Sequence, residues 1–237
     1  MCYIVDFMLD IVAFDLNKTL IRENSWYDLN LAMGITAEED ELLYRLGPES
    51  EGILTYTEWI DILVRLMRAR GKASRKNVER AILEFRYLDG AIDSVKVMQD
   101  RGFKVGLITG ALSLIAEKVA KELNMDFMYC NSQMKFDAND MLQEIRLKGE
   151  DFAVKVEAVI DLRRRFPETR EVYYVADGDT DEAIFQVTKS IMVSADQSLH
   201  EGWKRQALEE VQGLSTTRSA RFAWRITDSI VKVPQLI

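Results

Sequence analysis

Three short apolar runs, each followed directly by a polar or acidic residue, constrain the fold of this chain most strongly. The runs are Ile11–Phe14, Phe103–Ile108 and Val172–Ala176, and the residues that follow them are Asp15, Thr109 and Asp177. Runs of this length and composition predict buried strands, and helical stretches lie between them. Because strand–helix alternation is typical of a parallel sheet with helices on both faces, we predict an α/β fold with a doubly wound, Rossmann-like parallel sheet.

The segment 21–86 interrupts this alternation. Apolar residues recur three or four positions apart over 25–46 and 55–85, which predicts helices, and glycines punctuate both stretches. Strand signals are absent from the segment. We therefore predict two domains: an α/β core domain formed by 1–20 and 87–237, and a helical cap domain formed by 21–86.

Beyond residue 87 the alternation of strands and helices resumes. We predict helices at 91–99, 112–123, 152–166 and 197–211, strands at 127–131 and 190–194, and a β-hairpin at 133–147. The tail 214–237 carries several large apolar residues and is predicted to pack back as a short helix plus a strand or coil.

Composition narrows the classes of function. The 237 residues include 48% hydrophobic and 30% charged residues, which is ordinary for a globular protein. The formal net charge is −8 and the sequence pI is near 4.9, which argues against nucleic-acid binding and against a basic membrane surface. No run approaches the ~18 apolar residues that a membrane span needs. We expect a small-molecule partner, no nucleic acid and no membrane, with monomer and homodimer both open.

Histidine and cysteine are scarce. His200 is the only histidine, and we interpret it as a surface residue, which disfavours histidine triads and histidine-rich metal sites. Cys2 and Cys130 lie far apart and form neither a disulfide framework nor a zinc signature. A reducing cytoplasm is the predicted location.

The residues that follow parallel strands meet at the edge of the sheet where such folds bind ligands. Together with Lys155 on the predicted helix 152–166, these residues also have plain structural interpretations. Thr109 could be a helix cap, Lys155 a surface lysine and Asp177 part of a turn. Taken together, they favour phosphoryl transfer. Asp15 would attack phosphorus and form an aspartyl phosphate, and Mg²⁺ would be held by carboxylates of Asp15 and Asp177. Thr109 and the helix start at Gly110 would bind phosphate, while Lys155 would neutralise charge.

In these residues the chain resembles the haloacid dehalogenase superfamily of phosphohydrolases. The matching motifs are Asp15-Leu16-Asn17-Lys18-Thr19, Leu107-Ile108-Thr109-Gly110, Lys155 and Ala176-Asp177-Gly178-Asp179-Thr180-Asp181. The helical insertion and the hairpin are similar to the phosphoserine phosphatase-like branch. The resemblance implies a Mg²⁺ cofactor bound by Asp15, Asp177 and the backbone carbonyl of Asn17. It also implies that Asp181 supports either the metal or Lys155.

Asn17 departs from the family pattern, in which an aspartate at this position acts as general acid and base. Asparagine can neither protonate a leaving oxygen nor activate water. Losing one such group typically lowers the rate by about 10²–10⁴-fold, whereas metal and phosphate binding do not depend on it.

The cap also departs from the pattern of phosphoserine phosphatases, which carry a glutamate nine residues after the nucleophile to bind the substrate amine. Asn24 stands there with Glu23 beside it, and both are candidates for substrate binding. The arginine that binds the substrate carboxylate aligns near Asp61, and Arg65 and Arg68 are candidate substitutes. These differences leave phosphoserine specificity open.

The leading hypothesis is a Mg²⁺-dependent phosphomonoester hydrolase of the phosphoserine phosphatase-like type, acting on a small phosphorylated metabolite. Its catalytic residues are Asp15, Asn17 at the acid/base position, and Lys155. The alternative is a catalytically impaired member that binds a phosphorylated ligand. A third possibility is phosphoryl transfer without hydrolysis, which a long phosphoenzyme lifetime would distinguish.

Overall fold

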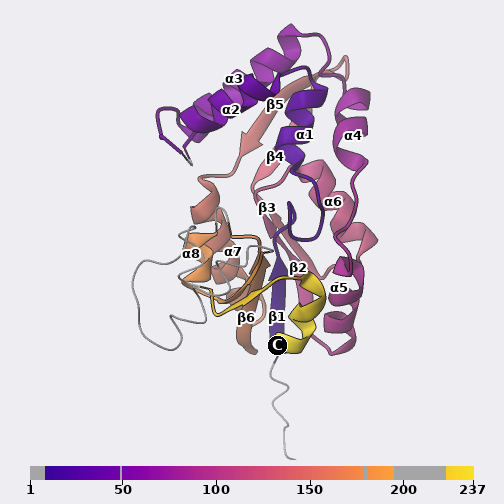
Figure 1. The fold of residues 1–237 in the computed structure, drawn as a ribbon, viewed down its shortest axis with the longest axis vertical. Coiled ribbons are helices and arrows are strands. Elements are labelled where there is room, and N and C mark those ends of the chain that lie inside the picture. Colours follow the sequence, from indigo (N-terminus) through magenta and orange to yellow (C-terminus); the bar gives the residue numbers. More distant parts are fainter. Residues whose placement is uncertain (1–8, 49, 179–180, 195–222) are drawn as a thin grey trace, which may run out of the picture.

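The computed structural model describes residues 9–48, 50–178, 181–194 and 223–237, and within them six strands form one parallel sheet (Figure 1). The strands are β1 (Leu9–Phe14), β2 (Lys104–Thr109), β3 (Phe127–Cys130), β6 (Thr169–Ala176), β7 (Lys189–Val193) and β8 (Arg225–Thr227), in the order β3-β2-β1-β6-β7-β8. The chain extends the sheet first on one side of β1 and then on the other. This confirms the predicted doubly wound sheet, with the reversal of strand order at β1.

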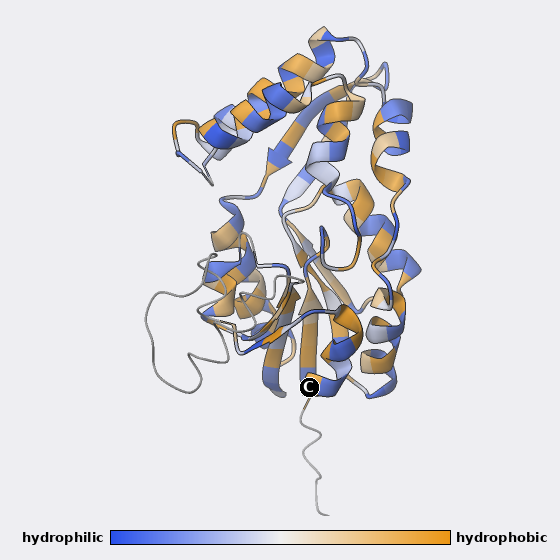
Figure 2. Ribbon diagram, in the orientation of Figure 1, coloured by the Kyte–Doolittle hydropathy of each residue, from blue (hydrophilic) through white to orange (hydrophobic). Residues whose placement is uncertain are grey.

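Strand β1 is apolar from Ile11 to Phe14, where both of its faces are covered. Val12 and Phe14 belong to the core on the side of α5 (Ala91–Asp100) and α6 (Ser113–Glu122). Ile11 and Ala13 belong to the core on the opposite side, under α7 (Asp151–Arg165) and α8 (Glu182–Phe185). All four residues are fully buried, and Figure 2 shows the apolar colour concentrated in the central strands. The alternation of side chains along a strand explains the division between the two cores.

Four helices occupy the segment between β1 and α5, and they lie beyond the carboxyl ends of the sheet strands (Figure 1). They are α1 (Ser25–Ala32), α2 (Ala37–Leu46), α3 (Tyr56–Ala69) and α4 (Arg75–Leu83). Each of the two predicted helical stretches is thus divided into two helices. Gly34 and Gly71, both with positive φ, lie in the two breaks. Thr36 then caps the start of α2 and forms a capping box with Glu39.

The predicted hairpin is confirmed as β4 (Ser132–Phe136) and β5 (Leu142–Leu147), which pair antiparallel. It contacts α6 of the core, where Ser113 donates its backbone N–H to Ser132 Oγ over 3.0 Å, and it also contacts the inserted helices. Leu142 N–H donates to Ala73 O over 2.8 Å, and Arg68 of α3 donates to the carbonyl of Leu142 over 2.9 Å. The hairpin therefore lies between the cap helices and the core, and the predicted domain division, which assigned 133–147 to the core, stays a prediction.

The described part of the tail, 223–237, packs against the core as predicted. It contributes β8 to the sheet edge, followed by the 3₁₀ helix η2 (Ile230–Lys232) and α10 (Val233–Leu236). Ser94 of α5 fixes this segment by donating from its hydroxyl to Ile230 O over 2.9 Å. The predicted helix 197–211, with His200, lies outside the described residues. Among the described helices, none combines the length and apolar character needed to cross a membrane.

Candidate active site

The loop after β1 brings the first and last predicted motifs together. Asp15, which is 7% exposed, donates its backbone N–H to Val175 O over 2.8 Å and so continues the pairing of β1 with β6. The loop then turns back, and Thr19 becomes fully buried. Its hydroxyl oxygen accepts from the backbone N–H of Asp177 over 3.0 Å. Asp15 and Asp177 are therefore held at the same edge of the sheet.

A cavity of about 550 Å³ lies between this edge and the cap. Its core-side lining consists of Asp15, Asn17, Lys18, Gly110, Ala111, Asn131, Asp151, Lys155 and Asp177. Five of the predicted site residues are thus in one place, and the predicted Asn24 lines the same cavity from the start of α1. Thr109 is buried directly behind it, where its oxygen accepts from the N–H of Ala111 over 3.1 Å.

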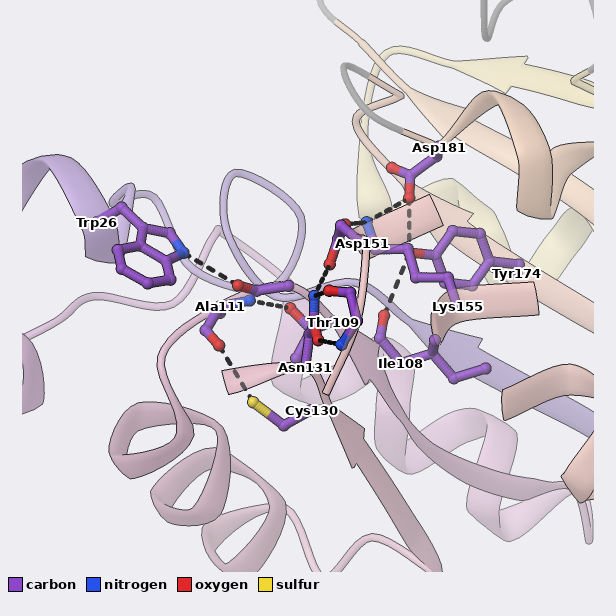
Figure 3. A network of polar contacts seen from close by, with 12 residues as sticks. Trp26, Ile108, Thr109, Ala111, Cys130, Asn131, Asp151, Lys155, Tyr174 and Asp181 are labelled. Atoms are coloured by element: carbon purple, nitrogen blue, oxygen red, sulfur yellow. Dashed lines mark hydrogen bonds and ion pairs between the residues drawn. The ribbon is translucent and has the colours of Figure 1, made fainter. Parts of the chain in front are cut away.

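Lys155 is the best anchored charge of the site (Figure 3). Its ammonium lies 2.7 Å from Asp181 Oδ1 and 3.0 Å from Asp151 Oδ2, and the side chain is 4% exposed. Asp181 Oδ1 also accepts from the hydroxyl of Tyr174 over 2.9 Å. Burial alone would lower the pKa of Lys155, but the charges of Asp151 and Asp181 outweigh it and raise the pKa well above its ordinary value. Lys155 therefore stays protonated.

The environment of Asp15 opposes its ionisation. Burial raises the pKa of Asp15 to about 8. The positive charge of Lys155 and a hydrogen bond with Thr109 act in the other direction, while the charges of Asp181 and Asp177 add to the rise. Further positive charge in the cavity would therefore favour the ionised form of Asp15.

Asp151 is a site residue that sequence reasoning missed. It begins α7, is 6% exposed, and accepts from Asn131 Nδ2 over 3.3 Å through Oδ1. A methyl group at Gly110 would lie 2.5 Å from the same oxygen, so a side chain there would have to displace the Asp151 carboxylate. The spacing of Asp151 and Lys155, four residues apart on a helix, was the available signal.

Asp181, predicted to support the metal or Lys155, is 1% exposed and lies behind Lys155. It does not belong to the residues that line the cavity. Its Oδ1 accepts from Lys155, and a second hydrogen bond from the hydroxyl of Tyr174 holds the carboxylate in place against the lysine. The geometry favours the second of the two predicted roles.

Asn17, at the predicted acid/base position, is fixed by helix α1. Its Oδ1 accepts from the backbone N–H of Ser25 over 3.1 Å. Because an N–H group can only donate, the amide oxygen is the atom engaged, and the remaining group on this side chain is a donor. Asn17 can hold a hydrogen bond to a ligand oxygen, but it has no proton to give and no basic lone pair.

The two predicted substrate-binding residues of the cap are placed differently. Asn24 lines the cavity, and its Oδ1 caps α1 by accepting from Trp26 N–H over 3.2 Å. Glu23 is outside the cavity lining and accepts from the backbone N–H and the guanidinium of Arg86 over 3.0 and 3.2 Å. Neither Arg65 nor Arg68 belongs to the lining residues.

The cap side of the cavity has an aromatic character that sequence reasoning also missed. Its lining comprises Asn24, Trp26, Tyr27, Asn30, Asp40, Tyr44, Gly47, Pro48, Tyr56 and Trp59, together with Leu147 of the hairpin. Trp26 joins cap to core directly, because its Nε1 donates to Gly110 O over 3.0 Å (Figure 3).

Comparison with known proteins gives relatives of modest identity. A phosphoserine phosphatase from Archaeoglobus fulgidus is 22% identical over 177 residues, 74% of this chain, which thus spans about half (49%) of that relative. A phosphoserine phosphatase from Methanocaldococcus jannaschii is 22% identical over 185 residues, covering 74% of this chain and 81% of that one. A crystal structure of phosphoserine phosphatase in apo form shares the fold, with a TM-score of 0.72, 14% identity, and coverage of 97% and 99%.

The model of the haloacid dehalogenase-like hydrolase family matches residues 12–185. This range includes β1 with Asp15, the end of β2 with Thr109, Lys155 on α7, and the motif around Asp177. The match covers most of the chain, and the structural neighbour shares the fold over nearly the whole of it. The chain therefore belongs to the haloacid dehalogenase-like hydrolase family and is phosphoserine phosphatase-like within it.

Proposed function

We propose that this protein is a Mg²⁺-dependent phosphomonoester hydrolase that acts on a small phosphorylated metabolite through an aspartyl-phosphate intermediate. The observation that carries the proposal is the convergence of Asp15, Asp177 and the protonated Lys155 in one cavity beneath a cap. A nucleophilic carboxylate splits hydrolysis into two easier steps, and a buried cation stabilises the charge that develops on phosphorus oxygens.

Each residue has a defined task in this proposal. Asp15 Oδ attacks phosphorus, the bond from phosphorus to the leaving oxygen breaks, and water later cleaves the acyl phosphate to regenerate the carboxylate. Lys155, held by Asp151 and Asp181, faces the phosphoryl oxygens with a fixed positive charge. The phosphate lies beside Gly110, which lines the cavity in the loop between β2 and α6.

The donor chemistry fits a magnesium ion. Mg²⁺ takes one or two carboxylates and keeps several waters or phosphate oxygens, and Asp15 and Asp177 supply two carboxylates to the same cavity. Among the described residues no cluster of three or more acidic, histidine or cysteine side chains could hold a metal ion by itself. When bound, the ion would supply positive charge against both nucleophile and phosphate.

Asn17 favours a second candidate, a protein that binds phosphorylated ligands with little turnover. The amide is already tied to Ser25 through its oxygen, so neither protonation of the leaving group nor activation of water is available from this side chain. An aspartate at this position could accept the same hydrogen bond from the start of α1 and still offer its second oxygen.

Phosphate release from p-nitrophenyl phosphate and phosphoserine, with and without Mg²⁺, separates the two candidates. Three forms are compared: the unaltered protein, Asn17→Asp and Asp15→Asn. We expect Asn17→Asp to gain about two orders of magnitude or more and Asp15→Asn to be inactive. If Asn17→Asp stays inactive on a broad phosphomonoester panel while phosphate and Mg²⁺ still bind, the hydrolase proposal fails and the binding protein takes its place.

The lifetime of the phosphoenzyme tests the remaining possibility of transfer without hydrolysis. Acid-quenched samples of the unaltered protein and of Asn17→Asp would be compared for acyl phosphate on Asp15. Accumulation in the unaltered protein that vanishes in Asn17→Asp supports a hydrolase arrested at the second step, because that step needs the base.

A further inference from the structure

The cap half of the cavity is built from matching faces of three helices. Each helix supplies two lining residues spaced three or four positions apart: Trp26 and Asn30 on α1, Asp40 and Tyr44 on α2, and Tyr56 and Trp59 on α3. Residues at this spacing lie on one face of a helix. Three such faces converge on one space, so this wall is a shaped binding surface.

Aromatic rings dominate this wall. Five of its lining residues are tryptophans or tyrosines: Trp26, Tyr27, Tyr44, Tyr56 and Trp59. The rings of Trp26 and Trp59 are 5.5 Å apart and tilted by 51°, so they do not stack on each other in parallel. Aromatic faces attract cations, and ammonium groups enclosed by several rings are bound in this way.

The polar groups of the wall also favour a cation. Asp40 lines the cavity and accepts from Asn30 Nδ2 over 2.6 Å. Burial raises the pKa of Asp40, so its charge is held at a cost that a cationic ligand would offset. Asn30 is 1% exposed, and its Oδ1 is a buried acceptor with no hydrogen-bond partner among the described residues.

Within the described lining, the positively charged side chains lie at the other end of the cavity. Among the described lining residues the only lysines are Lys18 and Lys155, both on the core side, and no arginine lines it. Arg68 is instead engaged with the hairpin, where it contacts Leu142 O and Asp137. A carboxylate on the substrate would therefore meet Asp40 without a compensating cation.

We propose that the cap half of the cavity binds the ammonium group of a phosphomonoester whose alcohol carries no carboxylate. The ammonium lies among the aromatic rings, with Asp40 balancing its charge. This inference rests on the proposed function and names its substrate class. It places the phosphate at Asp15 and Lys155 and the cation at the opposite wall.

Three ligands of nearly equal size test the proposal. Propyl phosphate is neutral at its tail, phosphoethanolamine has an ammonium in place of the methyl group, and phosphoserine adds a carboxylate to phosphoethanolamine. Their dissociation constants for the unaltered protein would be measured by isothermal titration calorimetry with Mg²⁺, beside inorganic phosphate. We expect phosphoethanolamine to bind about tenfold more tightly than propyl phosphate, and phosphoserine to bind less tightly than phosphoethanolamine.

Asp40→Asn removes the charge and keeps the acceptor for Asn30. We expect it to bring phosphoethanolamine close to propyl phosphate in affinity without changing the affinity for inorganic phosphate. Glu41→Gln is the matched control, because it removes the same charge from the next, exposed residue of α2 and should preserve the preference.

Equal binding of propyl phosphate and phosphoethanolamine, tightest binding of phosphoserine, or an unchanged preference in Asp40→Asn would each overturn the ammonium site. The proposed hydrolase would survive these outcomes as long as inorganic phosphate binds. If inorganic phosphate does not bind and Asn17→Asp hydrolyses no phosphomonoester, the proposed function fails, and the ammonium site fails with it.

Discussion

Lys155 Nζ and Asp181 Oδ1 lie 2.7 Å apart, and their side chains are only 4% and 1% exposed. Asp151 approaches the same ammonium from the preceding turn of α7, and the charge of Asp15 acts on it as well. One buried cation therefore balances several carboxylates. Breaking a buried pair by removing one partner leaves uncompensated charge, which is much more costly than losing a surface pair.

Replacing this cation should destabilise the fold. We expect Lys155→Met to lower the free energy of unfolding by about 3–5 kcal/mol, measured by urea denaturation near neutral pH. Glu157→Gln, an exposed change on the same helix, serves as the control. A loss below about 1 kcal/mol would contradict this account of the network.

The contact between Gly110 and Asp151 predicts a steric coupling. In Gly110→Ala the new methyl group would lie 2.5 Å from Asp151 Oδ1, so we expect a loss of about 1–3 kcal/mol in stability, together with weaker phosphate binding. Asp151→Ala removes the obstructing oxygen. In a double-mutant cycle, the Gly110→Ala change should therefore cost less in the Asp151→Ala background, and strict additivity would refute the contact.

Glu23 predicts a specific acid sensitivity. Burial would raise the pKa of Glu23, but hydrogen bonds from Arg86 outweigh it and lower the pKa below its ordinary value of 4.5. A carboxyl group with a lowered pKa in the folded state stabilises the fold above its unfolded pKa. That contribution is lost as pH falls through the folded value. Unfolding free energies measured from about pH 6 downward should therefore fall less in Glu23→Gln than in the unaltered protein, and parallel curves would contradict the prediction.

Cys130 should be chemically inert in the folded protein. Burial raises the pKa of its thiol, and its Sγ donates to Ala111 O over 3.1 Å. Since the thiolate is the reactive species, we expect slow reaction with a thiol-specific disulfide reagent at neutral pH, and fast reaction after unfolding in urea. The Cys2→Ser variant isolates this signal. Equal rates in the folded and unfolded states would show that the thiol is accessible.

The strand-end residues could be predicted from sequence because the signal is local. A four-residue apolar run before Asp15 and a five-residue run before Asp177 predict buried strands, and parallel strands bring their ends together. The same reasoning placed Lys155 correctly on a helix. It did not reveal that the side chain is buried, since that depends on Asp181 and Tyr174 from another part of the chain.

Two features of the cap differ in how far the sequence predicts them. Its helix boundaries were present in the sequence, because Thr36 and Thr55 each precede a glutamate by three residues and form capping boxes in the structure. The aromatic wall could not be predicted from the sequence, since helical spacing shows which residues share a face of one helix but not which helix faces meet. Trp59 counts in the sequence only as one apolar residue of a predicted helix, and the pattern does not single out Asn30. Only the packing of three helices brings both into one cavity.

The position of β1 in the sheet has a consequence for the order of events in folding. Ile11 lies beside Lys104 on one side and Val172 on the other, so both neighbours of β1 come much later in the chain. The cap helices and their capping boxes need only local contacts, whereas the sheet must close long loops first. In a nascent chain, the apolar strand that precedes Asp15 is synthesised early. Its side chains stay exposed to solvent until β2 and β6 have been synthesised. The strand that leads to Asp15, the proposed nucleophile, is thus exposed to aggregation before folding is complete.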